Sequence, residues 1–263
     1  MEQPMDMSLT GRRALVCGAS QGIGRACAEA LAAAGASVTV LARQASSLES
    51  VRASLGDGDH HSLVADLSEW EAAAAAVTEH VEQTGPIHVL VNNSGGPKAG
   101  RAIDAEPADF LAGLTPHVLG SQAMARALVP GMRDEGYGRI INIVSTSVIT
   151  PISGLGVSNV VRGAIGNWMR ILAKELGPDG ITVNNILPGF VGTDRLGSLM
   201  EGRAQRDGTT PDAVADAWRS TIPVGRFGDP SELGGVCAFL ASPAASYISG
   251  VNLPVDGGRL AAN

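Results

Sequence analysis

The sequence contains few aromatic residues, few lysines and few cysteines. Aromatic side chains make up only 3% of the 263 residues, so the core must be built mainly from aliphatic side chains. Lys98 and Lys174 are the only lysines, and no run of basic residues occurs. Together with a formal net charge of −7, this argues against a nucleic-acid partner. No apolar run reaches the length of a membrane span, so we expect no membrane partner either.

The three cysteines, Cys17, Cys27 and Cys237, are too few and too widely spaced for a disulfide framework or a zinc site. They predict reduced thiols in a cytoplasmic protein. His60 and His61 are adjacent but have no third ligand near them in the sequence. We therefore expect no metal site.

The chain is predicted to form one domain over residues 9–263. Hydrophobic residues make up 44% and charged residues 17%, which is enough apolar material for a large core. Residues 1–8 are acidic and polar, lack the apolar stretch of a signal peptide, and are expected to form a loose tail. Residues 193–221 are polar, dotted with glycine and rich in both charges, so we expect a mobile lid over a substrate site.

Segments with strand-like and helix-like patterns alternate along the chain. The strand-like runs are 14–17, 37–41, 61–65, 89–91, 139–144, 182–187 and 252–255. The helix-like runs are 22–34, closed by Gly35, then 69–84, 109–133, 155–177 and 230–241. This alternation predicts an α/β fold, with a parallel sheet covered by helices on both faces.

A glycine-rich loop lies between the first predicted strand and the first predicted helix. Its glycines are Gly18, Gly22 and Gly24, and Ser20, Gln21 and Ile23 lie among them. Glycines let backbone amides approach a pyrophosphate, and the start of a helix adds partial positive charge. The loop therefore predicts a dinucleotide site; the alternative is a tight turn without a ligand.

The residue after the second predicted strand indicates which dinucleotide is bound. A site for NAD has a carboxylate there, to accept hydrogen bonds from the adenosine ribose. This chain has Arg43 instead. A guanidinium pairs with a 2′-phosphate through a forked contact, so NADP(H) is favoured over NAD(H). The alternative is that Arg43 is a solvated surface residue.

Further motifs follow in order along the chain. They are Asp66-Leu67, Asn92-Asn93-Ser94-Gly95, Asn184, Pro188-Gly189-x3-Thr193, the stretch 225–232 and Val255-Asp-Gly-Gly258. Together with the glycine-rich loop, they resemble the classical short-chain dehydrogenases/reductases, in particular the 3-oxoacyl-ACP-reductase-like branch. The resemblance covers nearly everything after residue 8.

The resemblance implies a doubly wound parallel sheet of the Rossmann type, with about seven strands. It implies roles for a set of cofactor-binding residues. Asp66 and Leu67 would flank the adenine, and Asn92 would brace the sheet. Thr193 would hold the nicotinamide carboxamide. The cofactor cleft would be lined by Asn93, Ser94, Gly95, Pro188, Gly189 and Val191. It also implies a homo-oligomer, either a tetramer or a dimer, or pairing with an active paralogue.

The catalytic positions depart from the family that the chain resembles. That family carries an Asn-Ser-Tyr-Lys set in which the tyrosine protonates the carbonyl oxygen. Here the serine is present as Ser145, but the tyrosine position holds Ser158 and the lysine position holds Arg162. The asparagine position holds His117. Arg162 would grip the ribose hydroxyls and stabilise an alkoxide, and both serines would donate hydrogen bonds to the same oxygen.

The altered set lacks an acid that titrates in a useful range. His117, with an ordinary pKa near ~6.5, is the first candidate proton donor. Lys98 is the second, because its loop is expected to border the substrate cleft. The alternatives are a structural His117, a solvated Lys98, and Ser158 and Arg162 as fillers of an inactive site.

Three functions remain open from the sequence. The leading hypothesis is an NADP(H)-dependent oxidoreductase that reduces a carbonyl, or oxidises an alcohol, with a non-standard proton donor. The second is a non-catalytic cofactor-binding subunit, and the third is a non-redox reaction on the same scaffold. The small-molecule substrate is expected to contact residues 96–101, 149–155 and 190–221, and its identity is left open.

Overall fold

Seven parallel strands form a single sheet in the computed structural model, which describes residues 5–261. The strands are β1 (Arg13–Cys17), β2 (Ser37–Ala42), β3 (His61–Val64), β4 (Val89–Asn92), β5 (Gly138–Ile143), β6 (Ile181–Pro188) and β7 (Asn252–Val255). Their order is β3-β2-β1-β4-β5-β6-β7. Since β1 lies between β2 and β4, the strand order reverses there and opens a crevice at the carboxyl ends of the strands. The predicted doubly wound sheet is confirmed.

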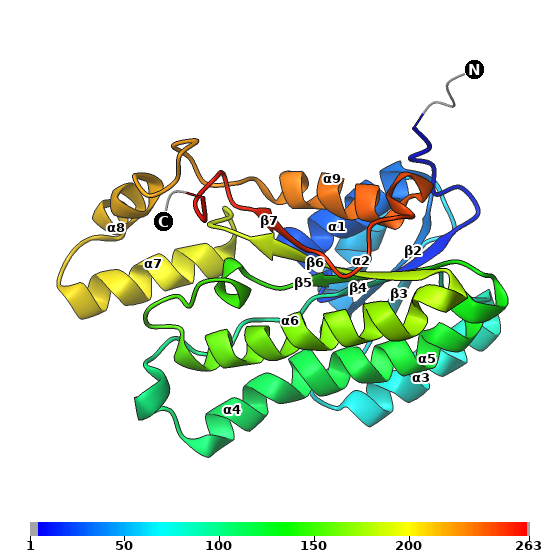
Figure 1. The fold of residues 1–263 in the computed structure, drawn as a ribbon, viewed down its shortest axis with the longest axis horizontal. Helices are drawn as coiled ribbons and strands as arrows, with labels where there is room; N and C mark the ends of the chain where they lie inside the picture. Colours follow the sequence, from blue (N-terminus) through cyan, green and yellow to red (C-terminus); the bar gives the residue numbers. More distant parts are fainter. Residues whose placement is uncertain (1–4, 262–263) are drawn as a thin grey trace.

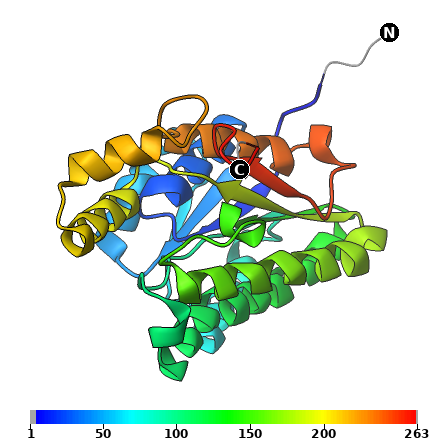
Figure 2. The same cartoon turned by 60° about the vertical axis from the view of Figure 1, so that its left-hand side comes forward.

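Helices cover both faces of the sheet (Figure 1). On one face lie α1 (Gly22–Ala33), α2 (Ala45–Ser54) and α9 (Pro230–Ala241). On the other lie α3 (Trp70–Thr84), α4 (Pro107–Leu114), α5 (Gly120–Asp134) and α6 (Gly156–Leu176). The pair α7 (Asp194–Asp207) and α8 (Pro211–Arg219) projects from one end of these layers (Figure 2).

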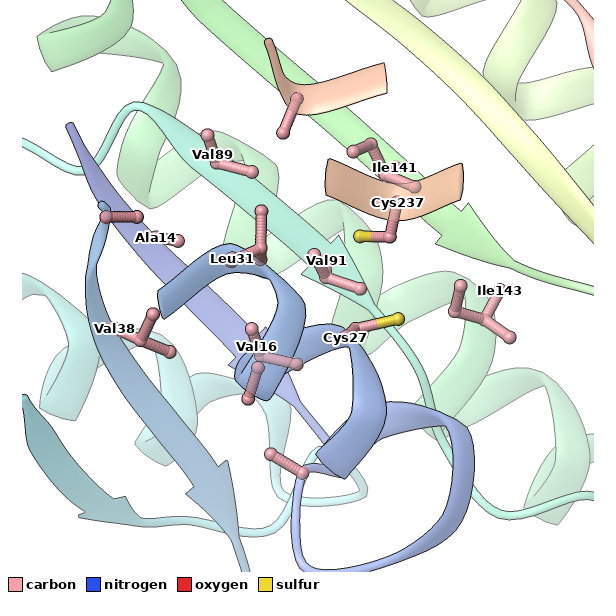
Figure 3. Close-up of a cluster of buried hydrophobic side chains, with 14 of the residues drawn as sticks. Ala14, Val16, Cys27, Leu31, Val38, Val89, Val91, Ile141, Ile143 and Cys237 are labelled. Atoms are coloured by element: carbon pink, nitrogen blue, oxygen red, sulfur yellow. The ribbon is translucent and has the colours of Figure 1, made fainter. Parts of the chain in front are cut away.

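Each helical layer encloses its own aliphatic core against the sheet. In the layer of α1 and α9, Val16 and Val91 from the strands meet Leu31 from α1 (Figure 3). Cys27 of α1 and Cys237 of α9 lie in the same cluster. A hydrogen bond with Cys27, together with burial, raises the pKa of Cys237 well above its usual value. The Cys237 thiol is therefore protonated at neutral pH, and all three cysteines of the chain are free and buried.

The crossing of α1 and α9 depends on one glycine, and a neighbouring glycine provides the matched control. A Cβ on Gly234 would lie 2.5 Å from the carbonyl oxygen of Ala26, whereas a Cβ on Gly235 would meet nothing within 4 Å. Gly234→Ala should lower the free energy of unfolding by about 1–3 kcal/mol, because backbone must move. Gly235→Ala should leave it unchanged or raise it by up to about 1 kcal/mol. Urea unfolding of both variants measures this, and equal effects would contradict the close crossing.

Several boundaries differ from the sequence-based expectations. Helix α2 was not predicted, because only Leu48 and Val51 of it are buried and its apolar pattern is weak. The helix predicted over 109–133 is divided by a π-helical turn, Thr115–Leu119, between α4 and α5. The segment 193–221, expected to be a mobile lid, folds into α7 and α8; its mobility stays a prediction.

The predicted tail is only partly described. Residues 1–4 lie outside the described residues, while the carbonyl of Asp6 accepts a hydrogen bond from the Ala244 amide at 3.0 Å. Among residues 5–261, no helix has the length and apolar character to span a bilayer.

The two adjacent histidines take separate partners. His60 Nδ1 accepts a hydrogen bond from the Val38 amide at 3.1 Å, and His61 Nε2 lies 3.0 Å from Asp59 Oδ1. In the part of the chain that the structure describes, no three histidine, cysteine or acidic side chains gather as a metal site.

Candidate functional site

The glycine-rich loop is held tightly against β1, α1 and the loop after β4. Gly18 and Gly22 have φ values of +57° and +55°, in the left-handed region that favours glycine. A Cβ on Gly24 would lie only 2.2 Å from the Gly18 carbonyl oxygen. Asn93 Nδ2 donates hydrogen bonds to the carbonyls of Cys17 and Gly18, at 3.3 and 3.0 Å. Where the loop packs most closely there is therefore no room for a side chain, and the backbone is exposed to a ligand, as a phosphate-binding loop requires.

The start of α1 leaves its backbone amides without a side-chain cap. Gln21 occupies the N-cap position and makes no capping hydrogen bond, and the first turn carries no acidic residue. Ser20 precedes it in the loop, and Ile23 packs against the core under α1. Uncapped amides at a helix start favour an anionic ligand.

The segment after β6 reaches the same loop from the other side. Pro188 ends β6, and Gly189 and the buried Val191 lead to Thr193. The Thr193 methyl carbon lies 3.3 Å from the position that a Cβ on Gly22 would take. The sequence motifs around residues 18–24, 93 and 188–193 thus meet at the carboxyl ends of the strands.

The third part of this crevice lies at the ends of β2 and β3. The Ala65 amide donates to the Ala42 carbonyl at 3.1 Å, so Arg43 and Asp66 follow neighbouring strand ends. Leu67 is buried beside them. Arg43 is exposed and makes no ion pair with any carboxylate of residues 5–261. Its guanidinium is therefore available to a ligand.

His117 lies in the π-helical turn and is held at both ring nitrogens. Its Nε2 is 3.0 Å from the Gly95 carbonyl oxygen, which can only accept, so Nε2 carries the proton. Its Nδ1 then accepts from the Ser94 hydroxyl at 2.6 Å. Burial lowers the pKa of His117 to about 3, and the nearby charge of Arg162 contributes. The imidazole is therefore neutral and clamps the loop after β4.

The expectation that His117 titrates near its ordinary pKa is thus wrong for this structure. The sequence could not show the burial and the neighbouring guanidinium that together disfavour the charged ring. Its role as proton donor stays a prediction, and a neutral ring with both nitrogens engaged is poorly suited to it.

His117→Gln should make stability less sensitive to acid. Between pH values of 6.5 and about 3, the unfolded chain binds a proton at residue 117 that the folded protein does not. The stability from the neutral ring is fully present above this range and is lost as the pH falls through it, by about 1.4 kcal/mol per pH unit. The free energy of unfolding, measured with urea at several pH values in this range, should fall more steeply with decreasing pH for the wild type than for the variant. Equal slopes would contradict the depressed pKa.

Arg162 projects from α6 to the carboxyl end of β5. Its Nη1 donates to the Ile143 carbonyl at 3.1 Å, two residues before Ser145. The side chain is 9% exposed, and its buried Nε has no hydrogen-bond partner. Burial lowers the pKa of Arg162 to about 10, so the guanidinium still carries its charge at neutral pH. Ser158, one turn earlier on the same helix, is buried as well, and the Ser145 hydroxyl accepts from the Ser147 amide at 3.1 Å.

A second guanidinium faces this region from the start of α7. Arg195 Nη2 donates to the Pro97 carbonyl at 2.6 Å, which joins α7 to the loop after β4. The guanidinium lies against Gly96, where a Cβ would stand 3.3 Å from Nη2. Lys98 follows directly and is exposed, and its role as an acid stays a prediction.

Two features of this site were not found from the sequence. One is the π-helical turn, although Pro116 inside a helical pattern was a signal that regular α-helix is interrupted there. The other is the bond between Arg195 and Pro97, which joins residues far apart in the chain and has no local signal.

Comparison with known proteins agrees with this geometry. Residues 18–259 match the sequence model of a family described as Enoyl-(Acyl carrier protein) reductase. The chain is 36% identical to the short-chain reductase protein NovJ of Streptomyces niveus, over 94% of this chain and 93% of that protein. It is 35% identical to the 3-oxoacyl-[acyl-carrier-protein] reductase FabG of Pseudomonas aeruginosa, over 96% of this chain and 98% of that protein. The chain belongs to the short-chain dehydrogenase/reductase family. This confirms the family resemblance seen in the sequence.

A solved member of the short-chain dehydrogenase/reductase family has the same fold. L-sorbose reductase from Gluconobacter frateurii, in complex with NADPH and L-sorbose, superposes with a TM-score of 0.91 at 31% identity. The match covers 97% of this chain and 99% of that one. Members of this family are oxidoreductases that bind nicotinamide cofactors. We therefore expect this short-chain dehydrogenase/reductase to be an enzyme with such a cofactor.

Proposed function

We propose that the protein is an NADP(H)-dependent oxidoreductase that reduces a carbonyl with a non-standard proton donor. The observation that carries this proposal is the buried guanidinium of Arg162 at the end of β5, charged and with Nε unpartnered. A fixed positive charge of this kind stabilises the negative charge that develops on a carbonyl oxygen during reduction. The serines at 145 and 158 supply hydroxyl donors near the same strand end.

The residues present fit an NADP(H) molecule. The glycine loop is packed so closely that a Cβ on Gly24 would stand 2.2 Å from the Gly18 carbonyl oxygen, and the start of α1 offers uncapped amides to a pyrophosphate. Arg43 has no carboxylate partner in the described chain and would pair with the 2′-phosphate. Arg162 would hold the nicotinamide ribose, and Thr193 the carboxamide.

The reaction balances without an acidic side chain. NADPH, when bound, supplies the hydride to the carbonyl carbon, and water supplies the proton to the oxygen. Ser145 and Ser158 orient the carbonyl by donating hydrogen bonds, and Arg162 stabilises the alkoxide until it is protonated. His117 keeps the Ser94–Gly95 backbone in place through its two ring nitrogens. In this scheme, His117 is a positioning residue and water replaces it as the proton source.

Exposed apolar side chains support self-association of the chain. Leu111 of α4, Leu119 of the π-helical turn, and Val160 and Ile171 of α6 are 65%, 46%, 49% and 49% exposed. All four come from the helical layer of α4 to α6. We propose that this layer pairs with a second copy, giving a homodimer or homotetramer.

Cofactor titration followed by a carbonyl panel tests the function. The purified protein should bind NADPH more tightly than NADH and should oxidise NADPH in the presence of a suitable ketone or aldehyde. Tight NADPH binding without any turnover would favour the non-catalytic subunit instead. Product formation without a change in nicotinamide absorbance would indicate a non-redox reaction.

Arg43→Ala tests the choice of cofactor. The variant should bind NADPH about tenfold to a hundredfold more weakly, because a charge-assisted hydrogen bond to the 2′-phosphate is lost. Its affinity for NADH should hardly change. Arg52→Ala on α2 is the control, since Arg52 is exposed and paired with Glu49 at 2.8 Å. Equal losses for both cofactors would contradict a 2′-phosphate contact.

A further inference from the structure

Arg162 and Arg195 carry two positive charges toward the same region without a carboxylate between them. The only hydrogen bonds given by their guanidiniums within residues 5–261 go to backbone carbonyls, of Ile143 at 3.1 Å and of Pro97 at 2.6 Å. Other arginines, such as those in exposed pairs on α2 and α7, have carboxylate partners. Arg162 and Arg195 are therefore two guanidiniums of one region that have no carboxylate partner among residues 5–261.

The two guanidiniums are close enough to affect each other. Burial is the main cause that lowers the pKa of Arg162, and the charge of Arg195 is the second. Like charges near a buried site are unfavourable unless an anion neutralises them. The chain as a whole carries a net charge of −7, yet carboxylates are absent from this pair among the described residues. The arrangement is one that an incoming anion would stabilise.

The anion that fits here is not the cofactor phosphate. The phosphate cradle lies at Gly18–Gly24, and Arg43 stands at the end of β2. Thr193 contacts that cradle, but the Arg195 side chain turns to the loop after β4, where it lies against Gly96. Its guanidinium thus lies on the loop after β4, which is expected to border the substrate.

We propose that the substrate is an oxo acid, and that Arg195 is the residue that binds its carboxylate. This rests on the proposed carbonyl reduction and names the substrate class of the same site. A guanidinium presents two parallel N–H donors that match the two oxygens of a carboxylate. Arg162 is proposed to stabilise the reacting oxygen and Arg195 is close enough to act on Arg162, so the carboxylate should stand only a few bonds from the carbonyl. The product is the corresponding hydroxy acid.

The test compares an oxo acid with its neutral ester, using acetoacetate and methyl acetoacetate, and 2-oxobutyrate and its methyl ester. With NADPH, Arg195→Gln should raise the KM for the acid about tenfold to a hundredfold. It should leave the ester unaffected and the affinity for NADPH unchanged. Arg203→Gln, on the exposed side of α7, is the matched control. It should leave the KM values for acid and ester and the affinity for NADPH unchanged. An equal effect of Arg195→Gln on acid and ester would overturn the proposal.

Calorimetry on the complex with NADP⁺ separates this proposal from the proposed function. If both oxo acids bind the wild type and binding is lost in Arg195→Gln, the carboxylate site stands even when no reduction is seen. If neutral ketones are reduced and neither acid binds, the carboxylate site is wrong and the reductase stands. Dihydroxyacetone phosphate is a third probe, and its tight binding in place of the acids would overturn the assignment to a carboxylate.

Discussion

Arg162→Met is expected to lower kcat/KM about a thousandfold while leaving the protein at least as stable as the wild type. The rate falls because the charge that stabilises the alkoxide is removed, and loss of one such group costs about 10²–10³ in rate. Stability should rise, by about 1–3 kcal/mol, because a buried charge with an unpartnered Nε is replaced by an apolar side chain of similar length. Steady-state kinetics and thermal unfolding measure the two effects on the same sample.

The opposite directions of these two effects make the result specific. Arg170→Met, on the exposed face of the same helix, should change stability by no more than about 0.5 kcal/mol and should not affect turnover. Arg162→Lys should retain part of the rate, since it keeps the positive charge but loses the forked donors. A fall in both activity and stability of Arg162→Met would show instead that the guanidinium holds the fold together.

Gly24→Ala is expected to weaken NADPH binding by about a hundredfold or more. The new Cβ would stand 2.2 Å from the Gly18 carbonyl oxygen, so the loop must shift, and a shift of about 1 Å is enough for such a loss. For the wild type, NADPH at a hundred times its Kd should raise the free energy of unfolding by about 2.7 kcal/mol. The variant should show little of this increase.

Gly235→Ala on α9 is the control for a helical glycine in open space, and it should keep the full NADPH-induced stabilisation. Isothermal titration with NADPH gives both dissociation constants directly. Wild-type affinity in Gly24→Ala would mean that the cofactor does not use this loop.

The cofactor half of the site was largely predictable from the sequence, because its signals are local. A strand followed by Gly18, Gly22 and Gly24 and then by a helix defines the loop without further information. The convergence of Asn93 and Thr193 on that loop follows from strand order, since the carboxyl ends of parallel strands lie at one edge.

The catalytic half was less predictable, because it depends on burial and on contacts between distant residues. The positions of Ser158 and Arg162 could be found by counting, but the unpartnered Nε and the bond from Arg195 to Pro97 could not. The proton-donor role of His117 was inferred from an ordinary pKa, which the enclosed π-helical turn changes. Helix α2 was not predicted because its residues are mostly polar and give no clear helical repeat of apolar side chains.

The buried cysteines of this chain have a practical consequence for chemical labelling. Cys27 and Cys237 lie in the core between α1 and α9, and burial raises the pKa of Cys17 to about 12. Enclosed thiols do not react with maleimides while the fold is intact. A single cysteine introduced on the surface, for instance on α7 or α8, would therefore be the one site that takes a fluorescent or spin label. The native cysteines need not be removed before the movement of those two helices is followed spectroscopically.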